Sequence, residues 1–283
     1  YKNGTYNGVM KKFNEKGALV LSLLYKDGKI VEENPKLEKS AEIKSKTNSE
    51  GWIEYTGAFI DDTIPVGIHR WYNKNGTIIK AKLYGTDGVL FSDGIIDNEG
   101  KREGMTIFYY PDGKILSKGE YKDNKREGRW KFYGKDGTLE QEGDFRNDLP
   151  NGMWTWYYPD QSIKRTEMFL NGKEDGEYFE YDKTGKIITK GVFVEGEKEG
   201  EWFYHVGDHS ETGKYISGLR DGVWKYFYEN GNLQFEGKYI QGNLDGRVRL
   251  FYNDGKIMEE QYYINGIKEK TWKKYDRQGN IIL

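Results

Sequence analysis

Residues 128–151 read GRWKFYGKDGTLEQEGDFRNDLPN, and similar stretches recur along the chain with a period of 24 residues. Each copy opens on a glycine, and the series is Gly104, Gly128, Gly152, Gly176, Gly200, Gly222 and Gly246, with Lys270 where the next glycine is due. The spacing is 24 residues throughout, except for 22 between Gly200 and Gly222. A fixed period of roughly 20 to 50 residues is typical of stacked supersecondary units, each of which packs mainly on its neighbours.

Aromatic residues occupy three fixed places after the opening glycine. The second position holds Trp130, Trp154, Tyr178, Trp202, Trp224 and Trp272, and the fifth holds Tyr109, Tyr133, Tyr157, Tyr181, Phe227, Phe251 and Tyr275. The fourth position holds Trp71, Phe108, Phe132, Trp156, Tyr204 and Tyr226, but also Glu180 and Lys274. Short runs rich in aromatic residues favour β-strands. Each copy is therefore predicted to begin with a strand.

Two turns are predicted in each copy. The first contains Gly113 in one copy and Gly137 in the next, where a hairpin requires a positive φ angle. Gln161 replaces this glycine in another copy, so that turn is expected to be strained or of another type. The second turn is predicted where only Gly, Asn and Asp occur, because these residues tolerate left-handed backbone geometry. Its positions are Asn124, Asp148, Gly172, Gly196, Gly218, Gly242 and Gly266.

Each copy thus reads as strand, turn, strand, turn. The predicted fold class is all-β, an elongated single-layer antiparallel meander built from stacked hairpins in an open array. The second strand of most copies contains a Gly-x-aromatic step, as in Gly119-Glu120-Tyr121 and Gly213-Lys214-Tyr215. Glycine inside a strand often marks the close approach of another group. We therefore expect an aromatic ring of the neighbouring copy to lie across these glycines.

The copies resemble the MORN repeat family in its bacterial variant form, whose pattern is approximately Asn-Gly-Lys-x-x-Gly-x-Trp-x-x-Tyr-Tyr-x-x-Gly. Residues 171–181 (NGKEDGEYFEY) match it with Tyr178 in place of the tryptophan, and residues 218–228 match it with Trp224 in place. The resemblance covers about residues 104–283 and extends poorly into the N-terminal third. It implies an open array of β-hairpins that serves as an interaction module without catalytic activity. It also implies a bacterial cell-surface or secreted location, with a cytoplasmic one left open, and some bacterial relatives are described as antitoxins.

The chain is predicted to divide into a degenerate repeat at residues 1–30, a polar insert or flexible loop at 31–50, irregular repeats at 51–103 and the regular array at 104–283. The insert has no aromatic residue and many charged ones, which disfavours a packed core there. Tyr1-Lys2-Asn3-Gly4 looks like the end of a repeat already under way. The natural N-terminus is therefore expected to lie upstream, together with any export signal.

Composition limits the classes of function. The chain has no cysteine, which excludes disulfides, zinc–thiolate sites and cysteine nucleophiles. Its formal net charge is -2 and no basic stripe stands out, so nucleic acid is not a predicted partner. Phosphate-binding loops, nucleophile elbows and zinc-protease motifs are absent from the sequence. We predict that the protein is not an enzyme and uses no cofactor.

The aromatic positions differ in their expected roles. Rings at the second and fifth positions are interpreted as structural, because a single-layer array must bury something between its units. The fourth position also accepts Glu180 and Lys274, which indicates partial exposure. Its rings Trp71, Phe108, Phe132, Trp156, Tyr204 and Tyr226 form the candidate partner-binding row, and a purely structural role for them stays equally open.

Two polar features give weaker signals. His205, Asp208 and His209 could bind a metal, but no fixed spacing supports this, so a polar loop is favoured and no metal site is predicted. Loops 101–104 and 125–128 both read Lys-Arg-Glu-Gly and could contact anionic lipid headgroups. A solvated turn is favoured there, because each loop pairs its cations with an acid.

The predicted function is that of a non-enzymatic repeat scaffold, which binds a partner protein or peptide through an extended sheet surface with aromatic anchors. One alternative is a carbohydrate or cell-wall module that binds choline-like groups, although such cages need several rings converging on one pocket. A second alternative is an antitoxin-like protein that neutralises a partner toxin. Self-association is also left open, because a meander has two free sheet edges.

Overall fold

The computed structural model describes residues 8–13, 19–26, 29–33, 41–270 and 272–282. These residues form strands and turns, and none of them lies in a helix. The described part of the chain accordingly contains no helix of the length and hydropathy needed to cross a membrane. The chain divides into two compact units, unit 1 at Tyr1–Leu149 and unit 2 at Pro150–Leu283.

Unit 1 contains a small sheet and a longer meander. β1 (Gly8–Phe13), β2 (Leu19–Lys26) and β3 (Lys29–Glu33) form a three-stranded antiparallel sheet. In the meander each strand is antiparallel to the next in chain order. Its strands are β4 (Glu42–Thr47), β5 (Ile53–Ile60), β6 (Ile64–Tyr72), β7 (Ile78–Tyr84), β8 (Leu90–Ile96), β9 (Arg102–Tyr109), β10 (Ile115–Lys122), β11 (Lys125–Tyr133) and β12 (Leu139–Arg146).

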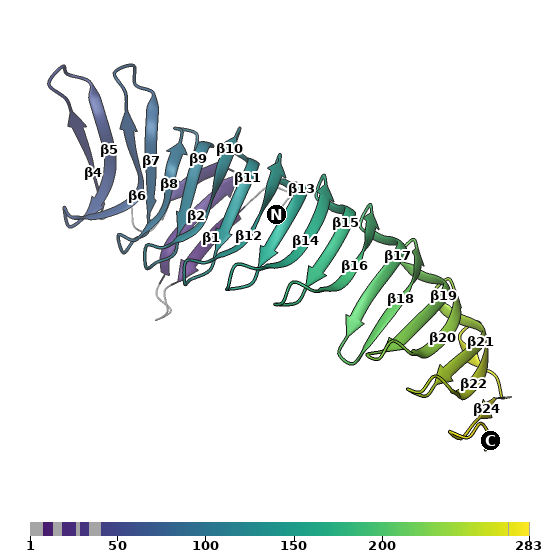
Figure 1. The fold of residues 1–283 in the computed structure, drawn as a ribbon. Helices are drawn as coiled ribbons and strands as arrows, with labels where there is room; N and C mark the ends of the chain where they lie inside the picture. Colours follow the sequence, from purple (N-terminus) through teal and green to yellow (C-terminus); the bar gives the residue numbers. More distant parts are fainter. Residues whose placement is uncertain (1–7, 14–18, 27–28, 34–40, 271, 283) are drawn as a thin grey trace. The chain divides into compact units, whose positions relative to one another are not determined.

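Unit 2 is a second run of antiparallel hairpins, and within each unit the strands follow one another in chain order (Figure 1). Its strands are β13 (Leu149–Tyr157), β14 (Ile163–Leu170), β15 (Lys173–Tyr181), β16 (Ile187–Val194), β17 (Glu197–Val206), β18 (His209–Ile216), β19 (Leu219–Tyr228), β20 (Leu233–Ile240), β21 (Asn243–Phe251), β22 (Ile257–Ile264), β23 (Ile267–Lys268) and β24 (Lys273–Lys274). The predicted all-β meander of stacked hairpins is confirmed, and the array is open.

The first turn of each copy closes on a residue in the left-handed region. Gly113 has a φ angle of 84°, and its N–H donates to the carbonyl of Tyr110 at 2.9 Å. Gln161 has a φ angle of 69°, and its N–H donates to the carbonyl of Tyr158 at 2.8 Å. The turn at Gln161 is therefore of the same type as the glycine turns, with its backbone strained because the residue carries a Cβ.

The second turn has two consecutive residues with positive φ, which is the type I′ geometry of tight hairpins. Asn171 has a φ angle of 50° and Gly172 one of 87°. All seven second-turn positions predicted from the sequence have φ angles between 64° and 91°. These turns also tie one copy to the next, because the N–H of Gly242 donates to the carbonyl of Arg220 at 2.8 Å.

The opening glycines are bulge residues. Their φ angles run from 62° at Gly128 to 122° at Gly176. Around Gly128 the register between β10 and β11 shifts, so that more residues stand on β11 than on β10. In the last copy Lys270 takes this place, and the strand there is interrupted between β23 and β24. Lys270 does not take the positive φ angle of the opening glycines, in keeping with the cost of that geometry for a residue with a Cβ atom.

The N-terminal sheet forms a separate layer in unit 1. Leu23 of β2 and Ile30 of β3 are buried in one cluster with Ala81, Leu83, Phe91 and Ile96 of β7 and β8. Figure 1 shows the small sheet in purple on one side of the meander. A Cβ atom on Gly100 would lie 2.4 Å from the Ile30 carbonyl oxygen, so only glycine allows this approach.

The domain division expected from the sequence stays a prediction. Within the expected insert 31–50 the structure describes the end of β3 and the whole of β4. Residues 34–40 of that insert, and Tyr1-Lys2-Asn3-Gly4, lie outside the described residues. The meander begins at β4, which pairs with β5. Among the described strands, its N-terminal edge is therefore β4.

Candidate functional site

Each meander has two faces of different chemistry. We refer to the face that carries Trp130, Trp154, Tyr178, Trp202 and Trp224 as the aromatic face, and to the opposite one as the charged face. A Cβ atom on Gly119 would lie 2.3 Å from Cδ2 of Trp130, and one on Gly213 would lie 2.3 Å from Cδ2 of Trp224. The expectation that rings lie across these glycines is confirmed, and Trp224 is fully buried as a result.

The other second-position and fifth-position rings vary in burial. Trp130, Trp154, Trp202 and Trp224 are buried, while Tyr178 and Trp272 are half-buried. Among the fifth-position rings Phe251 is buried, and Tyr109, Tyr133, Tyr157, Tyr181, Phe227 and Tyr275 are half-buried. Tyr133 lies on the charged face, where Nζ of Lys118 is 5.7 Å from its ring centroid. The fifth position thus packs side chains on the face opposite to the tryptophans.

The fourth-position rings pack beside the second-position rings. The ring centroids of Trp130 and Phe132 are 6.1 Å apart, and those of Trp202 and Tyr204 are 5.7 Å apart. In unit 1 Phe108 and Phe132 lie on the aromatic face, and in unit 2 Trp156, Tyr204 and Tyr226 do. All five are half-buried, so each ring contacts its neighbour and exposes the remainder of its surface.

Trp71 lies on the opposite face from the rest of the candidate row. The strand registers place Trp71 on the face of Asp93, whereas Phe108 shares the face of Ser92, the neighbour of Asp93 in β8. The cause is the connection at residues 85–89, a longer bulged turn where the regular copies have a two-residue turn. One unmatched residue moves every following side chain to the other face.

Most copies place a cation over the aromatic face, two residues before the opening glycine. This position holds Arg102, Arg126, Pro150, Glu174, Lys198, Arg220, Leu244 and Lys268. Nζ of Lys198 lies 4.4 Å from the ring centroid of Trp202, 4.9 Å from that of Tyr204 and 5.3 Å from that of Tyr215. Three rings therefore surround an ammonium that belongs to the chain itself.

The arginines of the Lys-Arg-Glu-Gly loops do not form solvated turns, so that interpretation was wrong for them. Arg102 is buried, and its Nη1 donates to Oγ of Ser92 at 3.2 Å. The guanidinium of Arg126 is 3.9 Å from the ring centroid of Phe145, and its Nε is 3.0 Å from Oδ1 of Asp148. The physical reason is strand alternation, which directs these side chains onto the aromatic face.

Hydrogen bonds fix the phenols of unit 2. Nζ of Lys198 donates to the Tyr204 hydroxyl at 2.7 Å, and that hydroxyl donates to Tyr215 at 3.3 Å. Nη1 of Arg220 donates to the Tyr226 hydroxyl at 2.5 Å. Burial raises the pKa of Tyr204, and the hydrogen bond with Tyr215 raises it further. These phenols therefore stay neutral and hold their rings in a fixed orientation.

The copy at β14–β15 departs from this pattern at three positions. Glu167 replaces the strand glycine, Glu174 replaces the cation and Glu180 replaces the fourth-position ring. Glu167 is only 6% exposed, and its nearest cation is Arg165, with Nε at 3.6 Å from Oε2. Burial raises the pKa of Glu167, and nearby Glu174 raises it further, whereas Arg165 lowers it.

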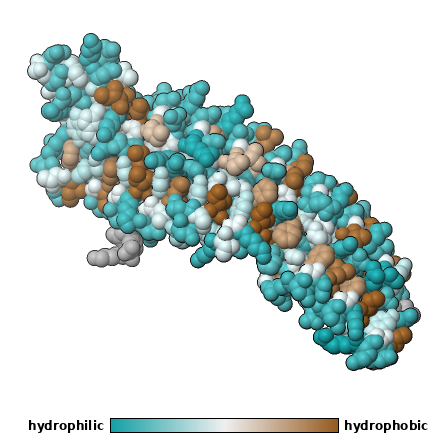
Figure 2. Space-filling model, in the orientation of Figure 1, coloured by the Kyte–Doolittle hydropathy of each residue, from teal (hydrophilic) through white to brown (hydrophobic). Residues whose placement is uncertain are grey.

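The charged face carries ion pairs between neighbouring strands. Nη2 of Arg129 lies 3.3 Å from Oε1 of Glu142, and Nζ of Lys131 lies 3.3 Å from Oε2 of the same carboxylate. Pairs of this kind at the surface contribute little individually. On the face visible in Figure 2 the hydrophobic residues form small patches separated by hydrophilic ones. The charged face thus combines cross-strand ion pairs with exposed apolar residues such as Met153 and Val223.

His205 and His209 lie on opposite faces. His205 pairs with Ser210, whereas the neighbouring pair is Tyr204 with Glu211, and the His209 ring is 5.8 Å from that of Tyr226 on the aromatic face. Nδ1 of His209 is 3.1 Å from Oδ1 of the exposed Asp208, and this hydrogen bond raises the pKa of His209. Within the described part of the chain no group of three or more potential ligands gathers, so the two histidines are not arranged to share a metal ion.

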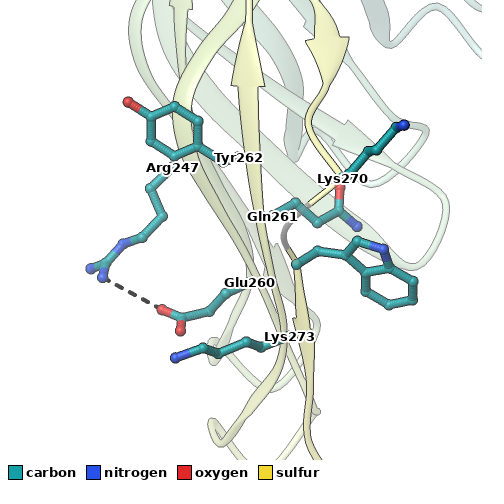
Figure 3. A pocket seen from close by; sticks show the side chains of 7 residues that line it. Arg247, Glu260, Gln261, Tyr262, Lys270 and Lys273 are labelled. Carbon is teal, nitrogen blue, oxygen red and sulfur yellow. Dashed lines mark ion pairs between the residues drawn. The ribbon is translucent and has the colours of Figure 1, made fainter. Parts of the chain in front are cut away.

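An open hollow of about 500 Å³ lies at the last hairpin of unit 2. It is lined by Arg247, Glu260, Gln261, Tyr262, Lys270, Trp272 and Lys273. Figure 3 shows the ion pair between Arg247 and Glu260, whose charged atoms are 3.5 Å apart. The hollow coincides with Gln261 and Lys270, which stand where other copies have glycine. The hollow therefore lies where the last copy departs from the repeat pattern.

The sequence pattern missed two kinds of residue on the aromatic face. The cations over the rings were hidden because lysines and arginines are dispersed evenly along the chain. Their signal was present, however, since five of the eight residues two places before the opening glycine are Lys or Arg. Glu174 is recognisable as an exception only when it is compared with the lysines and arginines at the same position of the other copies. The predicted partner-binding role of the fourth-position row is not tested by this geometry and stays a prediction.

Comparison with known proteins gives one family. Five segments match the model described as "MORN repeat variant", at residues 102–123, 126–147, 174–195, 220–241 and 244–265. No curated protein matches. Among solved structures, a chain of "Crystal Structure of TcdB2-TccC3-Cdc42" is 11% identical with a TM-score of 0.19, and the alignment covers 95% of this chain and 17% of that one. This chain thus spans about one sixth of the length of that one, and a TM-score of 0.19 does not indicate a shared fold.

Proposed function

Because five of the repeats match the MORN repeat variant model, we propose that the protein is a non-enzymatic scaffold that binds a partner protein or peptide on the aromatic face of unit 2. The observation that carries the proposal is the arrangement of Trp156, Tyr204 and Tyr226. All three rings lie on this face and are half-buried, so each is fixed by its neighbours and exposes only part of its surface to solvent.

Rings of this kind suit protein recognition. Their positions are set by contacts with second-position tryptophans and by hydrogen bonds to Lys198 and Arg220. A partner therefore meets rings that lose little conformational entropy on binding. Trp, Tyr and Arg are the residues that dominate protein interfaces. Anchors repeated along successive hairpins would let a partner make several modest contacts at once.

A small choline-like ligand is less well supported by the same geometry. The place where such a cation would sit, among Trp202, Tyr204 and Tyr215, contains the ammonium of Lys198. A similar place over Trp224 contains the guanidinium of Arg220, 3.9 Å from the ring centroid. An incoming ammonium would have to displace the chain's own cation, with no net gain in cation–π contact.

The proposal is tested by selecting peptides from a random displayed library on the immobilised intact chain and measuring their affinity by fluorescence anisotropy. Tyr204→Ala should weaken the selected peptides by at least about tenfold, equal to ~1.4 kcal/mol. Phe203→Ala is the matched control, because Phe203 is the half-buried neighbour on the charged face of the same strand. Hydroxyl-radical footprinting of the unmodified chain should show protection of Trp156, Tyr204 and Tyr226 on binding. Protection confined to the charged face, or equal losses in both variants, would reject the aromatic face as the binding surface.

A further inference from the structure

The departures at β14–β15 lie together in space as well as in the repeat. In the strand register Glu167 stands opposite Tyr178, Phe169 opposite Glu174 and Arg165 opposite Glu180. Directly opposite residues on one face are about 5 Å apart. Glu167 and Glu180 therefore flank the ring of Tyr178 on the aromatic face, and Glu174 lies farther along the same face, opposite Phe169.

Aromatic rings border this group of carboxylates. The ring centroid of Tyr178 is 5.7 Å from that of Phe193 and 5.8 Å from that of Trp202. On the other side Arg165 lies 3.7 Å from the ring centroid of Trp156. The hydroxyl of Tyr178 and the hydroxyl of Thr189 both donate to Oε2 of Glu180, at 3.4 Å and 3.3 Å. Glu180 is therefore held in place beside the ring by two donors of the chain.

The local charge balance is negative. Between residues 174 and 211 the chain has eleven acidic residues and four basic ones. The acidic residues are Glu174, Asp175, Glu177, Glu180, Asp182, Glu195, Glu197, Glu199, Glu201, Asp208 and Glu211, and the basic ones are Lys183, Lys186, Lys190 and Lys198. Among the residues that the structure describes, no lysine or arginine forms an ion pair with Glu174 or Glu180. Arg165 pairs with Glu167 and so places a cation of the chain within the group.

The neighbouring copies show what this place normally contains. At Lys198 and Arg220 the same position supplies a cation that lies over the rings of its own copy. At Glu174 the position supplies a carboxylate instead, although Tyr178 and Phe193 are retained. The site thus keeps the rings of a cation cage and reverses the charge of the residue that fills it.

We propose that this part of the aromatic face, at β14–β16, receives an arginine side chain from a basic segment of the partner, placed between Glu174 and Glu180 and against the ring of Tyr178. The inference rests on the proposed function and names the partner chemistry. Arginine fits better than lysine, because its planar guanidinium bonds two carboxylates in a fixed geometry and stacks on aromatic rings. In the copies at Lys198 and Arg220, the chain's own cation lies over the rings. In the copy at Glu174, the cation would come from the partner.

The test uses three labelled dodecapeptides, which alternate valine with arginine, lysine or glutamate, titrated against the intact chain by fluorescence anisotropy. The arginine peptide should bind at least about tenfold more tightly than the glutamate peptide, and more tightly than the lysine peptide. Glu174→Lys should weaken the arginine peptide by about tenfold or more, because it restores the chain's own cation. Glu177→Lys is the matched control, since it makes the same charge change on the charged face of the same strand. It should weaken binding by about threefold or less, through screened long-range attraction alone.

Equal losses in the two variants would overturn the inference, because net charge would then explain the binding. Failure of the arginine peptide to bind would overturn it as well. Glu174→Gln serves as a second variant if Glu174→Lys disturbs folding, and it should produce an intermediate loss. The proposed function is separately decided by the library peptides. If these footprint on Trp156 and Tyr204 but contain no basic residues and bind Glu174→Lys normally, the scaffold function stands and the arginine site is rejected.

Discussion

The absence of a Cβ atom on the strand glycines allows the tryptophan rings of this protein to pack against the backbone. The strand glycines Gly119, Gly191 and Gly213 each lie under the tryptophan of the next strand. Where Glu167 replaces that glycine, the facing ring is the smaller Tyr178, and it is less buried than the tryptophans. Where Gln261 replaces it, the following strand is interrupted before Trp272. The size of the ring and the presence of a Cβ atom beneath it are coupled.

This coupling gives a prediction at the residue scale. Gly213→Ala should destabilise unit 2 by about 3 kcal/mol, because the new Cβ would lie 2.3 Å from Trp224 in a place with no space to yield. The φ angle of Gly213 is not positive, so backbone strain does not contribute. Trp224→Tyr should recover part of the loss when combined with Gly213→Ala, while Trp224→Tyr alone should be destabilising. Urea unfolding of the four chains gives the double-mutant cycle, and strictly additive effects would contradict the coupling.

The buried carboxyl of Glu167 gives a pH-dependent prediction. Burial raises its pKa in the folded chain above the unfolded value, so folding favours the protonated form. This contribution to stability is fully present below the unfolded pKa and is lost as the pH rises through the raised folded pKa. Glu167→Gln should therefore stabilise unit 2 at pH 7, and the difference should shrink toward pH 4.

Urea unfolding at the two pH values measures this difference. Glu201→Gln, made at an exposed glutamate of the same unit, provides the matched control for the loss of one carboxylate. If Glu167→Gln were less stable than the unmodified chain at pH 7, the ion pair with Arg165 would outweigh burial, and the sign of the argument would be wrong.

Much of the residue-scale chemistry could be read from the repeat itself. The glycines under the rings were predicted because Gly-x-aromatic recurs in the second strand. The cations over the rings were not, because the pattern gives only their spacing, and the bulge at each opening glycine sets the local register of the strands. A bulge requires particular φ angles. A glycine that recurs at the same position permits those angles but does not show that they are adopted.

At the scale of the element, the turns explain both the regularity of the array and its exceptions. Each 24-residue copy combines one bulged hairpin with one two-residue turn, and this alternation keeps the tryptophans on one face. The 22-residue copy has a two-residue turn in both places, and the loss of two residues leaves Trp202 and Trp224 on that same face. Between β7 and β8 a bulged turn at residues 85–89 replaces the two-residue one. Trp71 consequently lies on the charged face, which the sequence pattern did not predict, because the spacing from residue 87 to Gly104 is irregular.

Gln161 gives a prediction at this scale. It occupies a left-handed turn position where glycine is common, with a φ angle of 69°. Gln161→Gly should stabilise unit 2 by ~1 kcal/mol, because it removes the strain of a Cβ atom in that region. The reverse change, Gly231→Gln, is made at the corresponding turn of the same unit, where the φ angle is 85°. It should destabilise by a similar amount. Thermal and urea unfolding of both variants would check the pair, and two changes of the same sign would contradict the turn assignment.

At the scale of the whole molecule, the chain covers part of one face by itself. The sheet β1–β3 packs on β7 and β8 through Leu23, Ile30 and Leu83, on the face that also carries Phe108. The sequence pattern suggested only a degenerate repeat there, because its spacing resembles that of the array and gives no information on long-range pairing. The rings of unit 1 thus lie in a meander that already has a sheet on its aromatic face. This difference favours unit 2 for the proposed interaction.

Among the described strands β4 forms the N-terminal edge of the meander, and its side chains bear on whether copies of this protein associate. β4 pairs with β5 on one side and has two lysines along it, and edge strands commonly use such charges to prevent pairing with another chain. Lys44 lies 2.8 Å from Asp62, and Lys46 forms an ion pair with Glu54 while its side chain remains 73% exposed.

We expect the unmodified chain to be monomeric. The double variant Lys44→Val with Lys46→Val should form dimers at concentrations of about 50 μM, a range in which exposed strand edges associate. Light scattering coupled to size-exclusion chromatography would measure the mass. Lys80→Val combined with Lys82→Val removes the same charge from the internal strand β7 and should stay monomeric. Dimers of the unmodified chain, or equal association of the two double variants, would show that the edge lysines do not keep the molecules apart.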